Sequence, residues 1–126
     1  MYPFLLVGLG GAIGAMARYG VGSLIGRLWS LSFPLATLLV NIFGSMLMGV
    51  FIGLLARYMP SQQAELRLFV AVGLLGGFTT FSSFSLDTIT LIERGALLQA
   101  GLYVLMSVVV CLIGLYLGLL MTRGVA

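Results

Sequence analysis

The sequence predicts an all-α integral membrane protein with four transmembrane helices, and three observations lead to that prediction. Hydrophobic residues make up 61% of the 126 residues and charged residues only 7%, too few for the surface of a soluble domain. The apolar residues form four stretches, each long enough to supply the about 20 helical residues that cross a bilayer. Because the connectors are short, residues 1–126 are expected to form a single four-helix domain.

The first two stretches are nearly uninterrupted by charge. The first extends from about Tyr2 to Ile25, and the second extends from about Phe33 to Ala56 with Pro34 near its start. No basic residue precedes Arg18, so the N-terminus lacks the charged start of a signal peptide. We therefore expect the first stretch to be retained as a membrane span.

The third stretch, from about Leu68 to Ile92, contains an unusual segment at its middle. Residues Gly76–Ser85 read GGFTTFSSFS, and paired glycines and consecutive threonines are poor helix formers. A helix break in hydrocarbon frees polar backbone groups, and it is tolerated only where protein buries it or where it lines a watery cavity. The segment therefore predicts a break in the third helix and a site built around that break.

The fourth stretch extends from about Ala96 to Met121 and carries a periodic set of polar residues. Tyr103, Ser107 and Cys111 recur every four residues, so they lie on one helix face. The two hydroxyl groups on this face predict a polar track. Ordinary packing with hydrogen bonds to the backbone is an equally good interpretation. Cys111 is the single cysteine and has no partner for an internal disulfide.

Glycine is frequent, with 18 copies, and many of them are spaced four residues apart. Small residues at this spacing allow helix backbones to approach closely within a membrane. Tight helix packing is therefore the expected role of most of these glycines, which include the pairs Gly10/Gly14, Gly22/Gly26, Gly49/Gly53, Gly73/Gly77 and Gly114/Gly118.

The arginines are divided almost evenly between the two sides of the membrane. With four spans, the side of the N-terminus holds Arg57, Arg67 and Arg123. The other side holds Arg27 and Arg94, and Arg18 reaches toward it from the first span. The positive-inside rule then gives no clear orientation. Two oppositely inserted copies could form an antiparallel dual-topology homodimer with sites near its two-fold axis. A single orientation set by weak signals is the alternative.

Three polar residues within the spans are candidates for function. Asn41 serves either a functional role or a helix–helix hydrogen bond, and its NH2 group can donate two hydrogen bonds to an anion. Arg18 either extends to the membrane interface or lines an aqueous vestibule, where it would raise the local anion concentration. Asp87, the only acid clearly inside a span, either pairs with an arginine or lies in a vestibule wall.

Two phenylalanines follow the glycine–threonine segment at helical spacing. Phe81 and Phe84 are surrounded by Ser82, Ser83 and Ser85, which is an odd setting for residues that face lipid. The edge of an aromatic ring is electropositive, so ring edges can contact an anion that has shed its water without holding it permanently. Packing or lipid contact is the ordinary alternative for such residues.

These motifs resemble those of a known family. Gly73–Ser85 closely resembles the signature of the Fluc (CrcB) family of fluoride ion channels, and Thr37–Gly44 resembles that family's asparagine motif. Gly14–Tyr19 resembles its first-span arginine motif, and Glu93–Gly95 is also similar. The similarity covers essentially the whole chain, and the third-span motif is far more specific than helix packing requires.

The resemblance implies a single channel domain that passes cytoplasmic fluoride down its gradient across the inner (plasma) membrane. It implies an antiparallel homodimer with two pores, whose fluoride pathway is formed by Asn41, Thr80, Phe81, Ser83, Phe84, Tyr103 and Ser107. Arg18 would lie in the vestibule. The backbone carbonyls of Gly76 and Thr79 would hold a central structural sodium ion (Na+), which suits hard oxygen ligands. The partners implied are a second copy, fluoride and the lipid bilayer.

Two positions depart from the family pattern. Cys111 stands where serine is frequent, which puts the far end of the polar track in doubt. Asp87 stands where glutamate is common, so any role at that position has a shorter reach.

Other functions fit the residues less well. A small dual-topology multidrug or cation exporter needs a titratable carboxylate in its binding chamber, whereas the first span has Arg18 and no acid. A non-transporting scaffold subunit would leave Asn41 and the glycine–threonine segment unexplained. With no histidine and one cysteine, an enzyme's triad or metal cluster cannot be assembled. The scattered positive charges do not predict a nucleic-acid partner.

Overall fold

The computed structural model describes residues 1–31, 33–58 and 63–123. Within these residues it has four helical spans that are long and apolar enough to cross a membrane. Three are continuous helices: α1 (Tyr2–Leu28), α2 (Leu35–Tyr58) and α6 (Leu97–Arg123). The other span, Gln63–Glu93, is divided into α3 (Gln63–Leu66), the π-helix η2 (Arg67–Leu75), α4 (Gly76–Phe78) and α5 (Phe81–Glu93). The prediction of a four-helix multi-pass membrane protein is confirmed.

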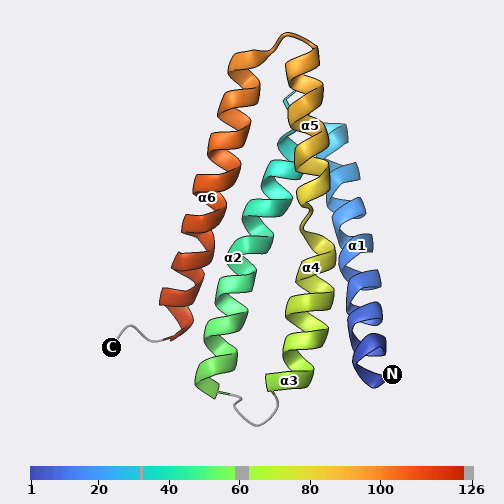
Figure 1. The fold of residues 1–126 in the computed structure, drawn as a ribbon, viewed down its shortest axis with the longest axis vertical. Helices are drawn as coiled ribbons and strands as arrows, with labels where there is room; N and C mark the ends of the chain where they lie inside the picture. Colours follow the sequence, from blue (N-terminus) through green and yellow to red (C-terminus); the bar gives the residue numbers. More distant parts are fainter. Residues whose placement is uncertain (32, 59–62, 124–126) are drawn as a thin grey trace.

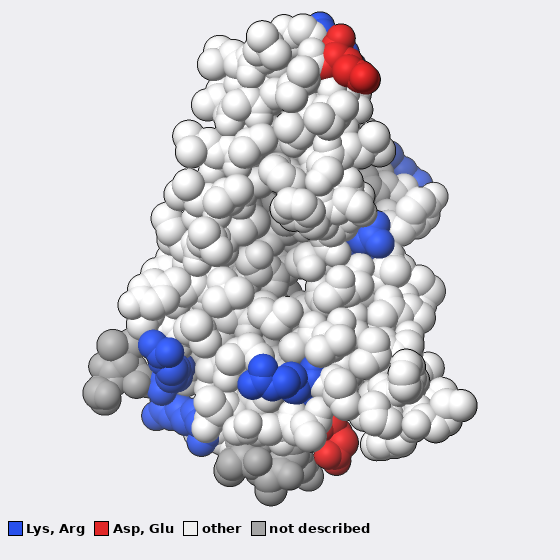
Figure 2. Space-filling view, viewed as in Figure 1, with Lys and Arg blue, Asp and Glu red and all other residues white. Residues whose placement is uncertain are grey.

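The spans alternate in direction, so both chain termini lie at the same end of the molecule (Figure 1). Arg57 and Arg123 lie in the last turns of α2 and α6, on the same side as the termini, and Arg67 begins η2 there. Arg27, in the last turn of α1, and Arg94, which caps α5, lie toward the opposite end. Figure 2 shows charged side chains toward both ends of this face and basic side chains at its right edge that reach close to mid-height, while most of the surface between the ends is uncharged. That uncharged surface is suited to contact hydrocarbon.

The first span packs closely against the third through glycine. A Cβ atom added at Gly14 would meet the carbonyl oxygen of Leu74, and one added at Gly10 would meet that of Phe69. From the other side, a Cβ atom at Gly77 would lie 2.7 Å from the carbonyl oxygen of Gly11. Backbones in such direct contact leave no room for a side chain, so these glycines are required by close approach.

The second and fourth spans pack against each other in the same way. A Cβ atom at Gly49 would meet the carbonyl oxygen of Leu115, and one at Gly53 would meet the Thr122 hydroxyl. That hydroxyl donates a 3.0 Å hydrogen bond to the carbonyl of Val50 across the two helices. A Cβ atom at Gly118 of α6 would in turn meet the α2 backbone. Close packing is therefore confirmed for Gly49, Gly53 and Gly118.

One predicted glycine pair does not pack in this way. Among the described residues, nothing lies within 4 Å of a Cβ atom built at Gly22 or Gly26. This pair is therefore an exception to the tight packing expected of most glycines. Gly22 instead borders a cavity.

A small apolar core joins α2, α5 and α6 near the α5–α6 turn. Leu38, Leu91, Ala100 and Tyr103 are buried together there. The turn itself contains Gly95, whose φ of 80° lies in the left-handed region that favours glycine. This core fixes the half of the third span that follows Thr80 against the fourth span, and so it positions the residues described next.

Candidate ion pathway around the third span

Two residues with extended backbone separate α4 from α5, and we call Thr79 and Thr80 the extended pair. Thr79 has φ −83° and ψ 160°, and Thr80 has φ −153° and ψ 117°. They lie midway along the Gln63–Glu93 span. The Thr80 hydroxyl accepts a 3.1 Å hydrogen bond from the backbone N–H of Ser83, which is the usual side-chain cap of a helix start. This cap explains why α5 begins at Phe81.

Asn41 of α2 bonds both backbone groups of Thr80. Its Oδ1 atom accepts from the Thr80 N–H at 2.8 Å, and its Nδ2 atom donates to the Thr80 carbonyl at 3.0 Å. Of the two roles open to Asn41 from its sequence, the interhelical hydrogen bond is therefore present. Its amide group has two N–H hydrogens, so a second one remains beyond the bond to Thr80.

The extended pair changes the hydrogen bonding of the carbonyls before it. In an uninterrupted α-helix, Gly76 and Thr79 would accept from the N–H groups four residues later. Those two N–H groups, of Thr80 and Ser83, bond to Asn41 and to the Thr80 hydroxyl instead. The Gly76 and Thr79 carbonyl oxygens thus lose their helical donors. They are hard oxygen ligands of the kind that a sodium ion accepts.

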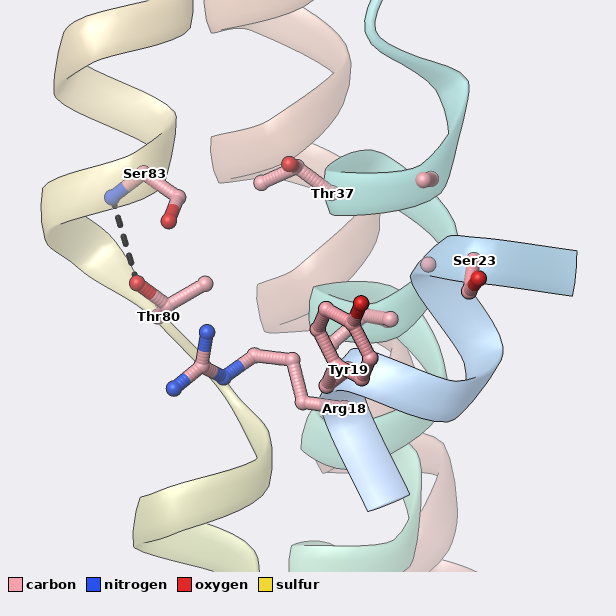
Figure 3. A pocket seen from close by; sticks show the side chains of 9 residues that line it. Arg18, Tyr19, Ser23, Thr37, Thr80 and Ser83 are labelled. Carbon is pink, nitrogen blue, oxygen red and sulfur yellow. Dashed lines mark hydrogen bonds between the residues drawn. The ribbon is translucent and has the colours of Figure 1, made fainter. Parts of the chain in front are cut away.

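A cavity of about 370 Å³ opens beside Arg18, between α1, α2 and the extended pair. The Nε atom of Arg18 donates a 3.1 Å hydrogen bond to the carbonyl of Gly77. Figure 3 shows the guanidinium group of Arg18 extending toward Thr80, with Ser83 and Thr37 on the far side of the cavity. Arg18 therefore lines a polar cavity. Its lining consists of Arg18, Tyr19, Gly22, Ser23, Ala36, Thr37, Val40, Thr80 and Ser83.

A second cavity, of about 350 Å³, lies where the extended pair and α5 face α2 and α6. The rings of Phe81 and Phe84 form one wall, with centroids 5.4 Å apart and planes tilted by 49°. Ser107 is only 7% exposed, and among the described residues its hydroxyl has no hydrogen-bond partner. The lining consists of Asn41, Ser45, Thr79, Thr80, Phe81, Phe84, Ser107, Val108, Cys111 and Leu112.

Known proteins resemble this chain over its full length. The model of the CrcB family, described as CrcB-like protein, camphor resistance, matches residues 5–119. The chain belongs to the CrcB family. A protein of Hyphomonas neptunium named fluoride-specific ion channel FluC is 49% identical over 99% of this chain and 98% of its own length. A FluC of Mesorhizobium japonicum is 51% identical over 98% of each chain, and one of Agrobacterium fabrum is 48% identical over 98% of each.

The relatives place this CrcB-family chain among ion channels, which are not enzymes. The family resemblance read from the sequence is thereby confirmed. The two cavities bring most of the expected pathway residues together. Asn41, Phe81, Phe84 and Ser107 line the second cavity, and Thr80 lines both. Ser83 lines the cavity that contains Arg18.

Tyr103, an expected pathway residue, lies in the apolar core beside Phe84. It is 0% exposed, and it does not appear in the lining of either described cavity. Its ring packs between Phe33 and Phe84, with centroid distances of 5.6 and 5.2 Å. Its hydroxyl donates a 3.1 Å hydrogen bond to Asp87. Tyr103 therefore packs against the ring of Phe84. The hydrogen-bond partner of Asp87 is thus this tyrosine hydroxyl.

Several lining residues of this CrcB-family chain were not anticipated as a pathway. Val108 and Leu112 each follow a residue of the polar face on α6 and line the second cavity. As apolar residues in an apolar helix they carry no sequence signal. Tyr19 and Ser23, which line the cavity with Arg18, lie one and five residues after that arginine. Tyr19 and Ser23 are four residues apart and so share a helix face, and this spacing is the signal that could have identified them.

Proposed function

We propose that the protein is a fluoride-selective channel of the inner membrane that lets cytoplasmic fluoride leave passively down its gradient. The observation that carries the proposal is the buried hydroxyl of Ser107, which faces the second cavity without a protein partner. A buried hydroxyl with no partner costs about 1–3 kcal/mol, so such a group needs a ligand or water. Relatives named fluoride-specific ion channels support fluoride as that ligand.

The walls of the second cavity suit a small anion. The Ser107 hydroxyl and the remaining N–H of Asn41 are hydrogen-bond donors, and the edges of Phe81 and Phe84 are electropositive. None of these groups carries a full charge, so an anion can leave its water for them and still move on. Arg18, in the neighbouring cavity, supplies the positive charge that would raise the local fluoride concentration.

A passive channel is sufficient to remove fluoride from the cytoplasm, because of the acid–base chemistry of hydrogen fluoride. At acidic external pH, hydrogen fluoride crosses the membrane as a neutral molecule and ionises in the more alkaline cytoplasm. The trapped anion then has an outward gradient. A pathway of fixed donors and ring edges lets the anion follow that gradient with no other energy source.

An antiparallel homodimer would complete the pathway. Phe81 is 77% exposed in a single chain, and Gly76 and Ser82 beside it are exposed as well. Polar backbone at the middle of a span cannot face lipid without cost, so a second copy is the natural cover. Two-fold symmetry would repeat the second cavity and give two pores. The nearly even division of arginines between the ends supports insertion in both orientations.

The same dimer would hold one structural sodium ion. The carbonyl oxygens of Gly76 and Thr79 have lost their helical donors, and Gly76 lies on an exposed face. A two-fold axis passing beside them would bring four carbonyl oxygens together, two from each copy. Sodium supplies the positive charge that binds the two broken helices to each other at that point.

Replacing Ser107 with alanine tests the pathway directly. We expect fluoride efflux from liposomes to fall roughly 100-fold, the usual cost of deleting one preorganised donor that stabilises a dehydrated anion. The measurement is initial efflux recorded with a fluoride electrode. Ser30→Ala, in the exposed connector after α1, is the matched control and should retain the full rate. An unchanged rate in a folded Ser107→Ala protein would remove Ser107 from the pathway.

A further inference from the structure

Asn41 lies in α2, yet it determines which hydrogen bonds the third span makes. We infer that Asn41 is a positioning residue for the cation site: by holding the N–H of Thr80, it keeps the carbonyl oxygen of Gly76 free to bind sodium. The inference rests on the proposed sodium site. It gives Asn41 a role that is separate from contact with fluoride.

The argument begins with a competition for one hydrogen. The N–H of Thr80 is the donor that an α-helix would direct to the Gly76 carbonyl. In the structure it donates instead to Oδ1 of Asn41 at 2.8 Å, and Nδ2 of Asn41 donates to the Thr80 carbonyl at 3.0 Å. Both contacts are partly buried, so water competes weakly for them. Asn41 therefore hydrogen-bonds both backbone groups of Thr80, as a neighbouring β-strand does. These two bonds keep Thr80 in its extended, non-helical conformation.

The surface of α2 is shaped to fit the extended pair. Gly44 follows Asn41 by three residues, so the two lie on one face of the helix. A Cβ atom at Gly44 would meet the Cγ2 atom of Thr79 and would lie 3.1 Å from the ring of Phe78. The absence of a side chain at Gly44 thus lets α2 approach closely enough for the short amide of Asn41 to reach Thr80.

Other groups do not replace Asn41 in this role. Arg18 bonds the carbonyl of Gly77, one residue beyond Gly76. The Thr79 hydroxyl donates to the carbonyl of Leu75 at 3.0 Å, so it is directed back along η2. With Asn41 removed, the Thr80 N–H has the Gly76 carbonyl as its nearest helical acceptor, and the two can form the missing helical bond. That bond would occupy the oxygen that sodium needs.

The arrangement connects the cation site with the fluoride pathway. Asn41, Thr79 and Thr80 all line the second cavity, which also contains Phe81 and Ser107. A sodium ion that binds the Gly76 and Thr79 carbonyls therefore favours the same extended pair that holds Asn41 in place. Loss of sodium would release the side chain that shapes one wall of the pathway.

The test measures sodium binding without measuring transport. Purified protein is heated in sodium chloride and in N-methyl-D-glucamine chloride of equal ionic strength, and the melting temperature of the folded dimer is recorded. A ligand that binds only the folded state raises the melting temperature. We expect sodium to raise it in the unaltered protein and in Ser107→Ala, whose substitution affects the pathway alone.

Two substitutions at Asn41 separate its roles. Asn41→Asp keeps an oxygen that can accept the Thr80 N–H, so it should keep the sodium-dependent rise even though its negative charge repels fluoride from the pathway. Asn41→Leu has a similar shape and no acceptor, so the rise should disappear. Asn41→Ser, whose hydroxyl is too short to reach Thr80, takes its place if Asn41→Leu does not yield folded dimer, and it should lose the rise too.

The possible failures are distinguishable. A full sodium-dependent rise in folded Asn41→Leu or Asn41→Ser would overturn the inference and leave the sodium site in place. No rise in the unaltered protein would overturn the sodium site, and the inference with it. Neither result bears on whether fluoride crosses through the second cavity, because that is measured by efflux.

Discussion

Substitution of Phe81 by isoleucine is expected to reduce fluoride efflux by roughly two orders of magnitude, the cost of losing one group that stabilises an ion away from water. Isoleucine is apolar and fills part of the same space, but it has no electropositive ring edge. Phe81 lies beside Phe84 in the wall of the second cavity and is 77% exposed in a single chain. Its ring is therefore not buried in a core and can contact an ion in the proposed pathway.

The measurement is initial fluoride efflux from liposomes at equal protein density, with size-exclusion chromatography to verify that the variant elutes at the same volume as the unaltered protein. Phe4→Ile is the matched control, because Phe4 is an exposed phenylalanine in the first turn of α1, away from the cavity. It should keep the full rate. If Phe81→Ile transports fluoride as fast as Phe4→Ile does, the ring edge of Phe81 has no part in conduction.

Substitution of Gly14 by alanine is expected to destabilise the fold more than any comparable change in α1. The new methyl group would meet the Leu74 carbonyl oxygen and lie 2.9 Å from the Phe78 nitrogen. Overpacking of this kind costs about 1–3 kcal/mol, and here the obstacle is backbone, which cannot rotate away. Because Gly77 and Phe78 immediately precede the extended pair, the displaced helix would also move the Gly76 and Thr79 carbonyls, which we propose bind sodium.

The measurement is the melting temperature of the purified protein, and Gly8→Ala supplies the comparison in the same helix. Among the described residues, nothing lies within 4 Å of a Cβ atom at Gly8. Alanine is also the better helix former by about 1 kcal/mol. Gly8→Ala should therefore melt no lower than the unaltered protein, whereas Gly14→Ala should melt well below it. Equal melting temperatures would contradict the close packing of α1 on the third span.

The amino-acid sequence predicts the four spans well, because membrane helices are recognised by long apolar stretches and short connectors. It also directs attention to Gly76–Ser85, where poor helix formers stand within hydrocarbon. The nine-residue π-helix Arg67–Leu75 was not predicted. Its apolar composition is that of an ordinary membrane helix, and the change of hydrogen-bond register has no distinct pattern of residues.

Long-range contacts within the site were beyond prediction from local patterns. The sequence marks Asn41 as a polar residue in a span, but its partner Thr80 is 39 positions away. The same is true of Arg18 and the Gly77 carbonyl, which are 59 positions apart. Backbone carbonyls have no sequence signature at all. For Tyr103, the helical stripe identifies the face that it shares with Ser107 but does not predict that its ring packs between Phe33 and Phe84.

Cys111 stands where serine is frequent in the family, and the structure shows where its side chain lies. Cys111 lines the second cavity together with Ser107, one helical turn before it. A thiol is a weaker hydrogen-bond donor than a hydroxyl. The strong donor on this part of α6 is therefore Ser107, which explains why the proposed pathway depends on that residue.

The central claim is that this protein conducts fluoride and not chloride. The most direct measurement is efflux from liposomes loaded with both anions and containing the purified, unaltered protein, recorded simultaneously with fluoride- and chloride-selective electrodes. The proposed function predicts rapid fluoride efflux with chloride retained. Retention of both anions by well-folded protein, or their release at similar rates, would contradict it.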